Sequence, residues 1–109
     1  MGNADIIKNL LGSENTMAYS KILANAIGLK EAIVYSCLLS KSAEKDSKGY
    51  FCYTIKDLQI DTTLTKAQQD RVIQNLVNLG LILCERKGLP AKRYFKINEY
   101  ALDTIKRGY

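Results

Sequence analysis

The side chains best suited to bind an anion lie close together toward the C-terminal end of the chain. Residues 85–96 hold a single acidic side chain, Glu85, and five basic ones: Arg86, Lys87, Lys92, Arg93 and Lys96. Such cations neutralise phosphate groups and release the counterions around a polyanion. A hairpin here would place Arg86 and Lys87 opposite Lys92 and Arg93, and like charges across strands repel until an anion binds. We expect these four residues to contact phosphates; the alternative is a lysine-rich edge that prevents strand pairing.

A second candidate set follows the predicted helix 65–79. Lys66, Ala67, Asp70, Arg71 and Gln74 should share the face opposite the apolar residues of this helix. Lys66 and Arg71 have the donors to bind guanine edges or phosphates, and Gln68 has an amide that can pair with adenine. The alternative is a solvated surface, with Gln68 acting only as a cap. Asp70 is expected to repel phosphate.

Two threonines are predicted to begin helices. Thr54, three residues before Asp57, and Thr65, three residues before Gln68, fit the capping-box spacing. The turn 61–64 between the two helices lacks the frequent glycine, so Thr62 or Thr63 could cap in place of Thr65. A plain cap is the simplest role for Thr54, although helix N-termini also bind phosphate.

The composition speaks against catalysis. The chain has no histidine, which removes the commonest general base and most catalytic zinc sites. Its three cysteines are odd in number and form no C-x-x-C pair. A net charge of +5 and the absence of a long apolar run or a signal peptide favour a basic cytoplasmic protein. We therefore expect no enzyme activity, no metal, no cofactor, no small-molecule substrate and no membrane partner.

The expected elements follow from apolar spacing, glycines and caps. Helices are predicted at 3–11, 21–27, 29–41, 55–60, 65–79 and 99–106, and strands at 17–21, 50–53, 81–87 and 92–97. The helix 65–79 should bury Val72, Ile73, Leu76 and Leu79, and Gly80 should end it in a Schellman motif. Phe95 should face the core rather than stack on bases. The fold class is mainly α with a small antiparallel β-sheet (α+β).

From residue 29 on, this order resembles the winged helix-turn-helix domains of bacterial, plasmid and phage replication initiators and related transcription regulators. The resemblance rests on residues 53–58 (YTIKDL), 65–69 (TKAQQ), 76–82 (LVNLGLI) and 87–98 (KGLPAKRYFKIN). It implies a recognition helix at about 65–79 in the major groove and a basic wing at 85–96 on the backbone. Extra helices at both ends would complete the chain: 1–15 helix and linker, 16–98 winged helix-turn-helix, 99–109 C-terminal helix.

The function this predicts is sequence-specific binding of double-stranded DNA without catalysis. Its candidate contacts are Thr54, Thr65, Lys66, Gln68, Arg71, Gln74, Arg86, Lys87, Lys92 and Arg93. The alternative is a winged-helix module that binds another protein. A homodimer is expected because Ile6, Ile7, Leu10 and Leu11 form an apolar stripe on a helix too short to be stable alone. The stripe could pack on a partner chain with Tyr100, Ala101 and Ile105, or fold back on its own domain.

Overall fold

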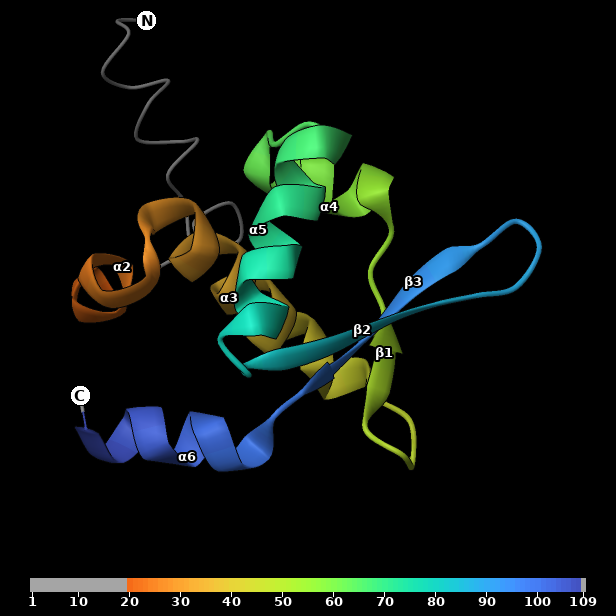
Figure 1. Ribbon diagram of the computed structural model, residues 1–109. Helices are drawn as coiled ribbons and strands as arrows, with labels where there is room; N and C mark the ends of the chain where they lie inside the picture. Colours follow the sequence, from red (N-terminus) through yellow and green to blue (C-terminus); the bar gives the residue numbers. More distant parts are fainter. Residues whose placement is uncertain (1–19, 109) are drawn as a thin grey trace, which may run out of the picture.

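The computed structural model describes residues 20–108 and arranges them as helices packed on a three-stranded antiparallel sheet. In chain order the elements are α2 (Lys21–Ile27), α3 (Leu29–Lys41), a 3₁₀ turn (Ser42–Glu44), β1 (Tyr50–Cys52), α4 (Ile55–Thr62), α5 (Lys66–Asn78), β2 (Ile82–Lys87), β3 (Lys92–Ile97) and α6 (Glu99–Gly108). The strand order is β1-β3-β2. This confirms the α+β class, and the order from α3 onward is that of a winged-helix-like fold (Figure 1).

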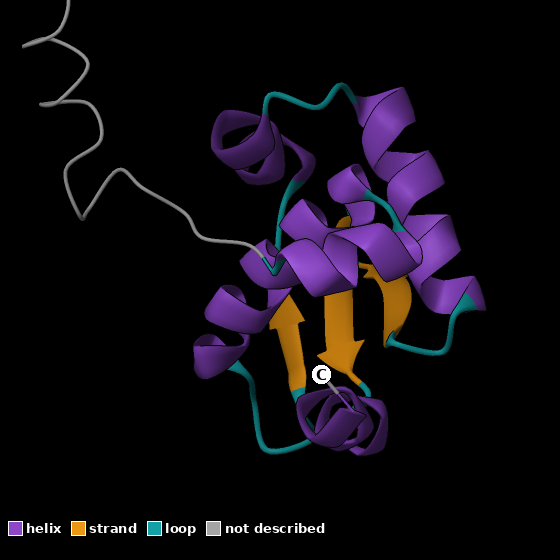
Figure 2. Cartoon of the chain, turned by 90° about the vertical axis from the view of Figure 1, so that its left-hand side faces the viewer, coloured by secondary structure: helices purple, strands orange, loops and turns teal. Residues whose placement is uncertain are grey.

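The central element of the fold is α3. It buries Ala32, Val34, Tyr35, Cys37 and Leu38 and packs against α2, α4 and α5. A helix that is apolar on nearly every side must be surrounded by other elements. Helices cover one face of the sheet, whereas α6 lies beyond the ends of the strands (Figures 1 and 2). The recognition-helix candidate α5 therefore rests directly on the core.

The turn between α4 and α5 is built without glycine. Thr63 ends α4 in the left-handed region at φ 64°, where glycine is more usual. Thr62 supports the turn, since its hydroxyl donates to the Leu58 carbonyl and accepts from the Leu64 amide. Helix α4 therefore runs two residues past the predicted end at Ile60, and Thr65, not Thr62 or Thr63, caps α5.

The C-terminal end of α5 confirms one prediction and corrects another. The amide of Leu81 donates to the Leu76 carbonyl at 3.1 Å and that of Gly80 to the Val77 carbonyl at 2.9 Å, which is the Schellman pattern. Gly80 adopts φ 76°, where glycine carries no Cβ penalty. Leu79 was predicted to be buried but is 53% exposed, because the motif turns Leu81 into the core instead.

The hairpin and the last helix are joined through Asn98. Its amide donates to the Leu81 carbonyl, its side chain donates to the Gly80 carbonyl, and its Oδ1 accepts from the Ala101 amide. Asn98 thus caps α6 and also fixes the end of α5 to the start of α6. Phe95 is fully buried, as its alternation with Lys96 predicted.

Part of the N-terminal prediction lies outside the described residues. Ser20 caps α2, with its hydroxyl accepting from the Leu23 amide at 3.1 Å, and Lys21 is already helical. The predicted strand 17–21 is therefore wrong at its last two residues, while 17–19 and the helix 3–11 fall in the part not described. Among residues 20–108, no helix is long and apolar enough to cross a membrane.

Candidate nucleic-acid interface

The two predicted cation sets belong to adjacent elements. Lys66, Arg71 and Gln74 are exposed on α5, and Arg86, Lys87 and Lys92 are exposed on the β2–β3 hairpin. The hairpin extends beyond the helices, with its tip well away from the core (Figure 1). A helix on the surface beside a projecting basic hairpin has the shape needed to contact a duplex groove and its flanking backbone.

The register of the hairpin is the one expected, and it sorts the basic side chains onto two faces. Arg86 pairs with Arg93, and Lys87 pairs with Lys92. Because neighbouring side chains on a strand point to opposite faces, the two arginines face α5 and the two lysines face the other way. The hairpin therefore carries positive charge on both faces. The arginine pair lies on the face toward α5, and the lysine pair lies on the opposite face.

Arg93 corrects the predicted contact set. Its side chain is only 3% exposed, and its Nη2 donates to Gln69 Oε1 at 2.6 Å. Its Cζ lies 5.6 Å from the centre of the Phe95 ring, and burial lowers the pKa of its guanidinium. A side chain held in this way is not available to phosphate, so Arg93 is removed from the contacts. It shares the buried face with Phe95 and Ile97, two and four residues later.

Gln69 is a residue that the sequence reasoning missed. It lies on α5 and is fully buried. Its Nε2 donates to the carbonyls of Ile55 and Leu64 at 3.1 and 3.0 Å, while its Oε1 accepts from Arg93. This one amide therefore connects the start of α4, the turn and the hairpin. A buried polar group needs such partners, since leaving one unpaired is destabilising.

Asp70 is the acidic residue expected to repel phosphate. Its carboxylate lies 3.1 Å from Lys66 Nζ, 3.5 Å from Arg86 Nη2 and 3.9 Å from Arg93 Nη1. It is thus the shared counter-ion of the helix and the hairpin. Repulsion between the two cation sets is reduced by a charge placed between them.

The capping residues are occupied as caps. Thr65 and Gln68 form a complete capping box, in which the side chain of each accepts from the backbone amide of the other, at 3.2 and 3.0 Å. Gln68 cannot pair with adenine while it holds this bond. Thr54 accepts from the Asp57 amide at 3.1 Å.

Two further predicted contacts, Gln74 and Lys87, form surface interactions. Gln74 donates to Asn78 one helical turn away at 2.9 Å. Lys87 pairs with Glu85 at 3.1 Å, which raises the Lys87 pKa, and its Nζ lies 5.1 Å from the centre of the Tyr50 ring. These are exposed contacts of the kind that contribute little to stability and are readily exchanged.

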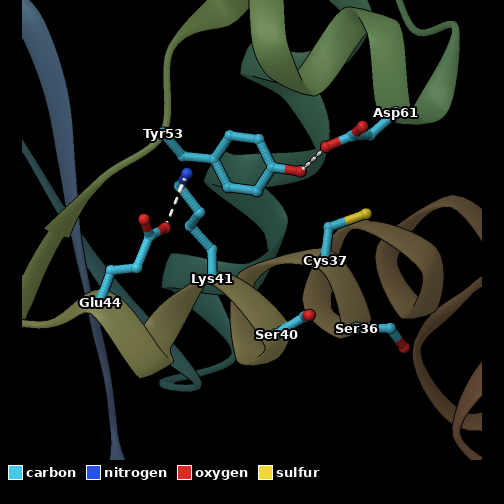
Figure 3. A pocket seen from close by; sticks show the side chains of 7 residues that line it. All are labelled: Ser36, Cys37, Ser40, Lys41, Glu44, Tyr53 and Asp61. Atoms are coloured by element: carbon cyan, nitrogen blue, oxygen red, sulfur yellow. Dashed lines mark hydrogen bonds and ion pairs between the residues drawn. The ribbon is translucent and has the colours of Figure 1, made fainter. Parts of the chain in front are cut away.

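A polar cavity of about 410 Å³ lies on a different part of the molecule, between α3 and α4. It is lined by Ser36, Cys37, Ser40, Lys41, Glu44, Tyr53 and Asp61 (Figure 3). The Tyr53 hydroxyl donates to the Asp61 carboxylate, and Lys41 pairs with Glu44 at 2.7 Å. No group of His, Cys, Asp and Glu residues in the described part of the chain could hold a metal ion. The Tyr53–Asp61 bond joins the residue just before α4 to the end of that helix.

The Tyr53–Asp61 hydrogen bond predicts that the free energy of unfolding decreases at alkaline pH. Burial and the bond to Asp61 raise the pKa of Tyr53 above its ordinary value of 10.0. The bond therefore stabilises the fold fully below about pH 10, and this contribution falls as the unfolded chain alone ionises. Between about pH 9 and pH 11 the wild type should lose about 1.4 kcal/mol more unfolding free energy than Tyr53→Phe. Denaturant titrations at both pH values measure this difference; equal losses in the two proteins would contradict it.

The chain was compared with known proteins by sequence and by structure, and only the structures gave matches. No protein-family model and no curated protein matches the sequence. Two solved structures are similar to the chain. One is described as "Structure of Rep-DNA complex" (15% identity, TM-score 0.58, covering 100% of this chain and 96% of that chain). The other is described as "N-Terminal domain of DNA binding protein" (18% identity, TM-score 0.56, covering 100% and 95%). At this level of identity the likeness establishes that the chain shares its α+β fold with these two proteins.

Proposed function

We propose that this chain is a non-catalytic, sequence-specific double-stranded DNA-binding module of the winged helix-turn-helix type. In this proposal α5 enters the major groove and the β2–β3 hairpin is the wing that contacts the backbone. The observation that carries it is the junction at Asp70, where Lys66 of the helix and Arg86 of the wing share one carboxylate at 3.1 and 3.5 Å. The two cation sets therefore form one continuous surface, which a duplex could span.

The fold comparisons support the same proposal. One neighbour is described as a complex of a Rep protein with DNA, and the other as a domain of a DNA-binding protein. Of the two roles the sequence suggested, this favours the recognition domain of a replication initiator over a transcription regulator. The proposed contacts are Thr54, Thr65, Lys66, Arg71, Gln74, Arg86, Lys87 and Lys92, with Gln68 retained as the cap of α5.

Base reading is proposed for Lys66 and Arg71, which are exposed in the first half of α5. N-terminal residues of a recognition helix are the ones that reach base edges. Alanine at either position should weaken binding to the preferred site by about 1–3 kcal/mol and relax the preference at one base pair. Selection from a randomised duplex library, run on each variant and on the wild type, measures both effects. Equal loss on every sequence would make these residues phosphate contacts instead.

A twofold homodimer is the second part of the proposal, since it would present two recognition helices to half-sites one helical turn apart. Ile6, Ile7, Leu10 and Leu11 lie outside the described residues, as does the side chain of Ile105. Within the described part, Leu83 and Tyr100 are 53% and 83% exposed near the start of α6.

Analytical ultracentrifugation tests the dimer. The full chain should sediment as a dimer, and a chain that starts at Thr16 should be a monomer at the same concentration, because the apolar stripe of residues 6–11 is then missing. A monomer at tens of micromolar in both cases would rule out dimerisation through this segment. A dimer that survives the truncation would place the contact elsewhere, for example around Leu83 and Tyr100.

A further inference from the structure

Asp70 occupies an unusual position for an acidic residue on a DNA-binding surface. It is 36% exposed and lies within ion-pair distance of Lys66, Arg86 and Arg93 at once. Its two oxygens could accept from all three cations, but the three distances differ. Lys66 and Arg86 are the closer partners of the Asp70 carboxylate, at 3.1 and 3.5 Å, and Arg93 is the most distant, at 3.9 Å.

Arg93 is left with unused donors. Its Nη2 is bonded to Gln69, but its Nε and Nη1 are buried without a hydrogen-bond partner. Buried donors of this kind are normally satisfied, and more strongly so when they are charged. Nη1 lies 3.9 Å from Asp70 Oδ1, within ion-pair range but beyond hydrogen-bond length. A movement of the carboxylate by about 1 Å would bring the two atoms to the usual charged hydrogen-bond distance.

The space around Asp70 allows such a movement. A cavity of about 360 Å³ lies between α5 and the hairpin, and its lining includes Asp70, Gln74, Arg86 and Arg93. The two closer partners of Asp70 are Lys66 and Arg86, whose side chains are 61% and 58% exposed. Exposed pairs are weak and are easily replaced by a stronger anion. Phosphate is such an anion for Arg86, and a base edge offers acceptors to Lys66.

We infer that Asp70 is a positioning residue that changes partners when DNA binds. In the free protein it holds Lys66 and Arg86 beside each other. When DNA binds these two cations, Lys66 at a base edge and Arg86 at a phosphate, its carboxylate moves onto Nη1 of Arg93. This inference rests on the proposed function. The exchange would remove the negative charge from the path of the phosphates and bond the recognition helix to the wing through Asp70–Arg93 as well as Gln69–Arg93. The complex would then be more tightly coupled than the free protein.

The side-chain NMR signals of Arg93 report the exchange directly. The full chain, labelled with ¹⁵N at arginine, is titrated with a mixed-sequence DNA duplex at low salt. We expect the Arg93 guanidinium signals to shift and rotation about its Cζ–Nη bonds to slow when DNA is added, although Arg93 does not touch the DNA. In Asp70→Ala these changes should be absent, because no acceptor remains beside Nη1 of Arg93. Binding with unchanged Arg93 signals in the wild type would overturn the exchange but leave the proposed function intact. No binding by the wild type would overturn both.

Affinity gives a second readout with a matched control. Asp70→Asn and Asp103→Asn remove one negative charge each, and Asp103 is exposed on α6, which lies away from the tip of the hairpin (Figure 1). Simple repulsion by Asp70 predicts that Asp70→Asn binds DNA more tightly than Asp103→Asn. The exchange predicts the opposite, a loss of about tenfold relative to Asp103→Asn, because one charged hydrogen bond is missing from the complex. Denaturant unfolding of each variant confirms that folded proteins are compared. Tighter binding by Asp70→Asn would contradict the inference.

Discussion

Alanine at Arg86, Lys87 and Lys92 together is expected to weaken binding to duplex DNA of any sequence by roughly a hundred-fold at 0.1 M salt. All three side chains are exposed on the projecting hairpin. If each contacts one phosphate, the slope of log affinity against log salt should flatten by about 2.7 in total. Arg93 is not included in this set, because its buried side chain bonds to Gln69.

A control separates local contacts from total charge. Alanine at Lys21, Lys30 and Lys45 removes the same charge from exposed positions on α2, on α3 and after the 3₁₀ turn. The slope of log affinity against log salt should stay within about one unit of the wild-type value in this variant. At 0.1 M salt, charges more than about 10 Å from the DNA are largely screened from it. If both triple variants lost the same affinity and slope, the wing would not be part of the interface.

The largest expected change in stability comes from Arg93. Replacement by alanine should lower the unfolding free energy by about 3 kcal/mol, because it opens space in the core and leaves the Gln69 Oε1 atom without its partner. Arg93→Met keeps much of the volume and should lose less, about 1–2 kcal/mol, since only the unpaired oxygen remains. Both values come from chemical denaturation monitored by circular dichroism.

The neighbouring residue is the matched control for this prediction. Lys92 is exposed on the opposite face of the same strand, so Lys92→Ala should change stability by less than about 0.5 kcal/mol. The two alanine variants are expected to weaken DNA binding for different reasons. Lys92→Ala loses a phosphate contact in a stable protein, whereas Arg93→Ala weakens the support of the wing. Equal loss of stability in the two alanine variants would contradict the buried role of Arg93.

The elements of the fold that sequence predicts best are those set by bonds within a few residues. The Thr65–Gln68 capping box and the Schellman end at Gly80 have the predicted hydrogen bonds, since both depend on local spacing alone. The end of α4 was placed two residues early, because Thr63 takes the left-handed conformation that glycine usually supplies. Leu79 fits the helical period yet lies outside the core, because the helix ends before it.

The errors at the site have a different cause. Arg93 follows the same two-residue alternation that places Phe95 and Ile97 in the core, but its charge favoured the surface. Its burial depends on Gln69, which in turn needs the Ile55 and Leu64 carbonyls. These partners come from separate parts of the chain, so no pattern within a single helix or strand predicts them. The pairing of Asp70 with Arg86 depends on the same kind of contact between separate elements, so the sequence of the helix alone does not predict it.

The salt dependence of duplex binding tests the central claim most directly. The full chain is titrated onto a labelled mixed-sequence duplex at several salt concentrations between about 50 and 200 mM. With Arg86, Lys87 and Lys92 each on one phosphate, log affinity should fall against log salt with a slope of about −2.7 per bound chain. No binding at the lowest salt, or an affinity that salt leaves unchanged, would contradict a DNA-binding role and favour a module that binds another protein.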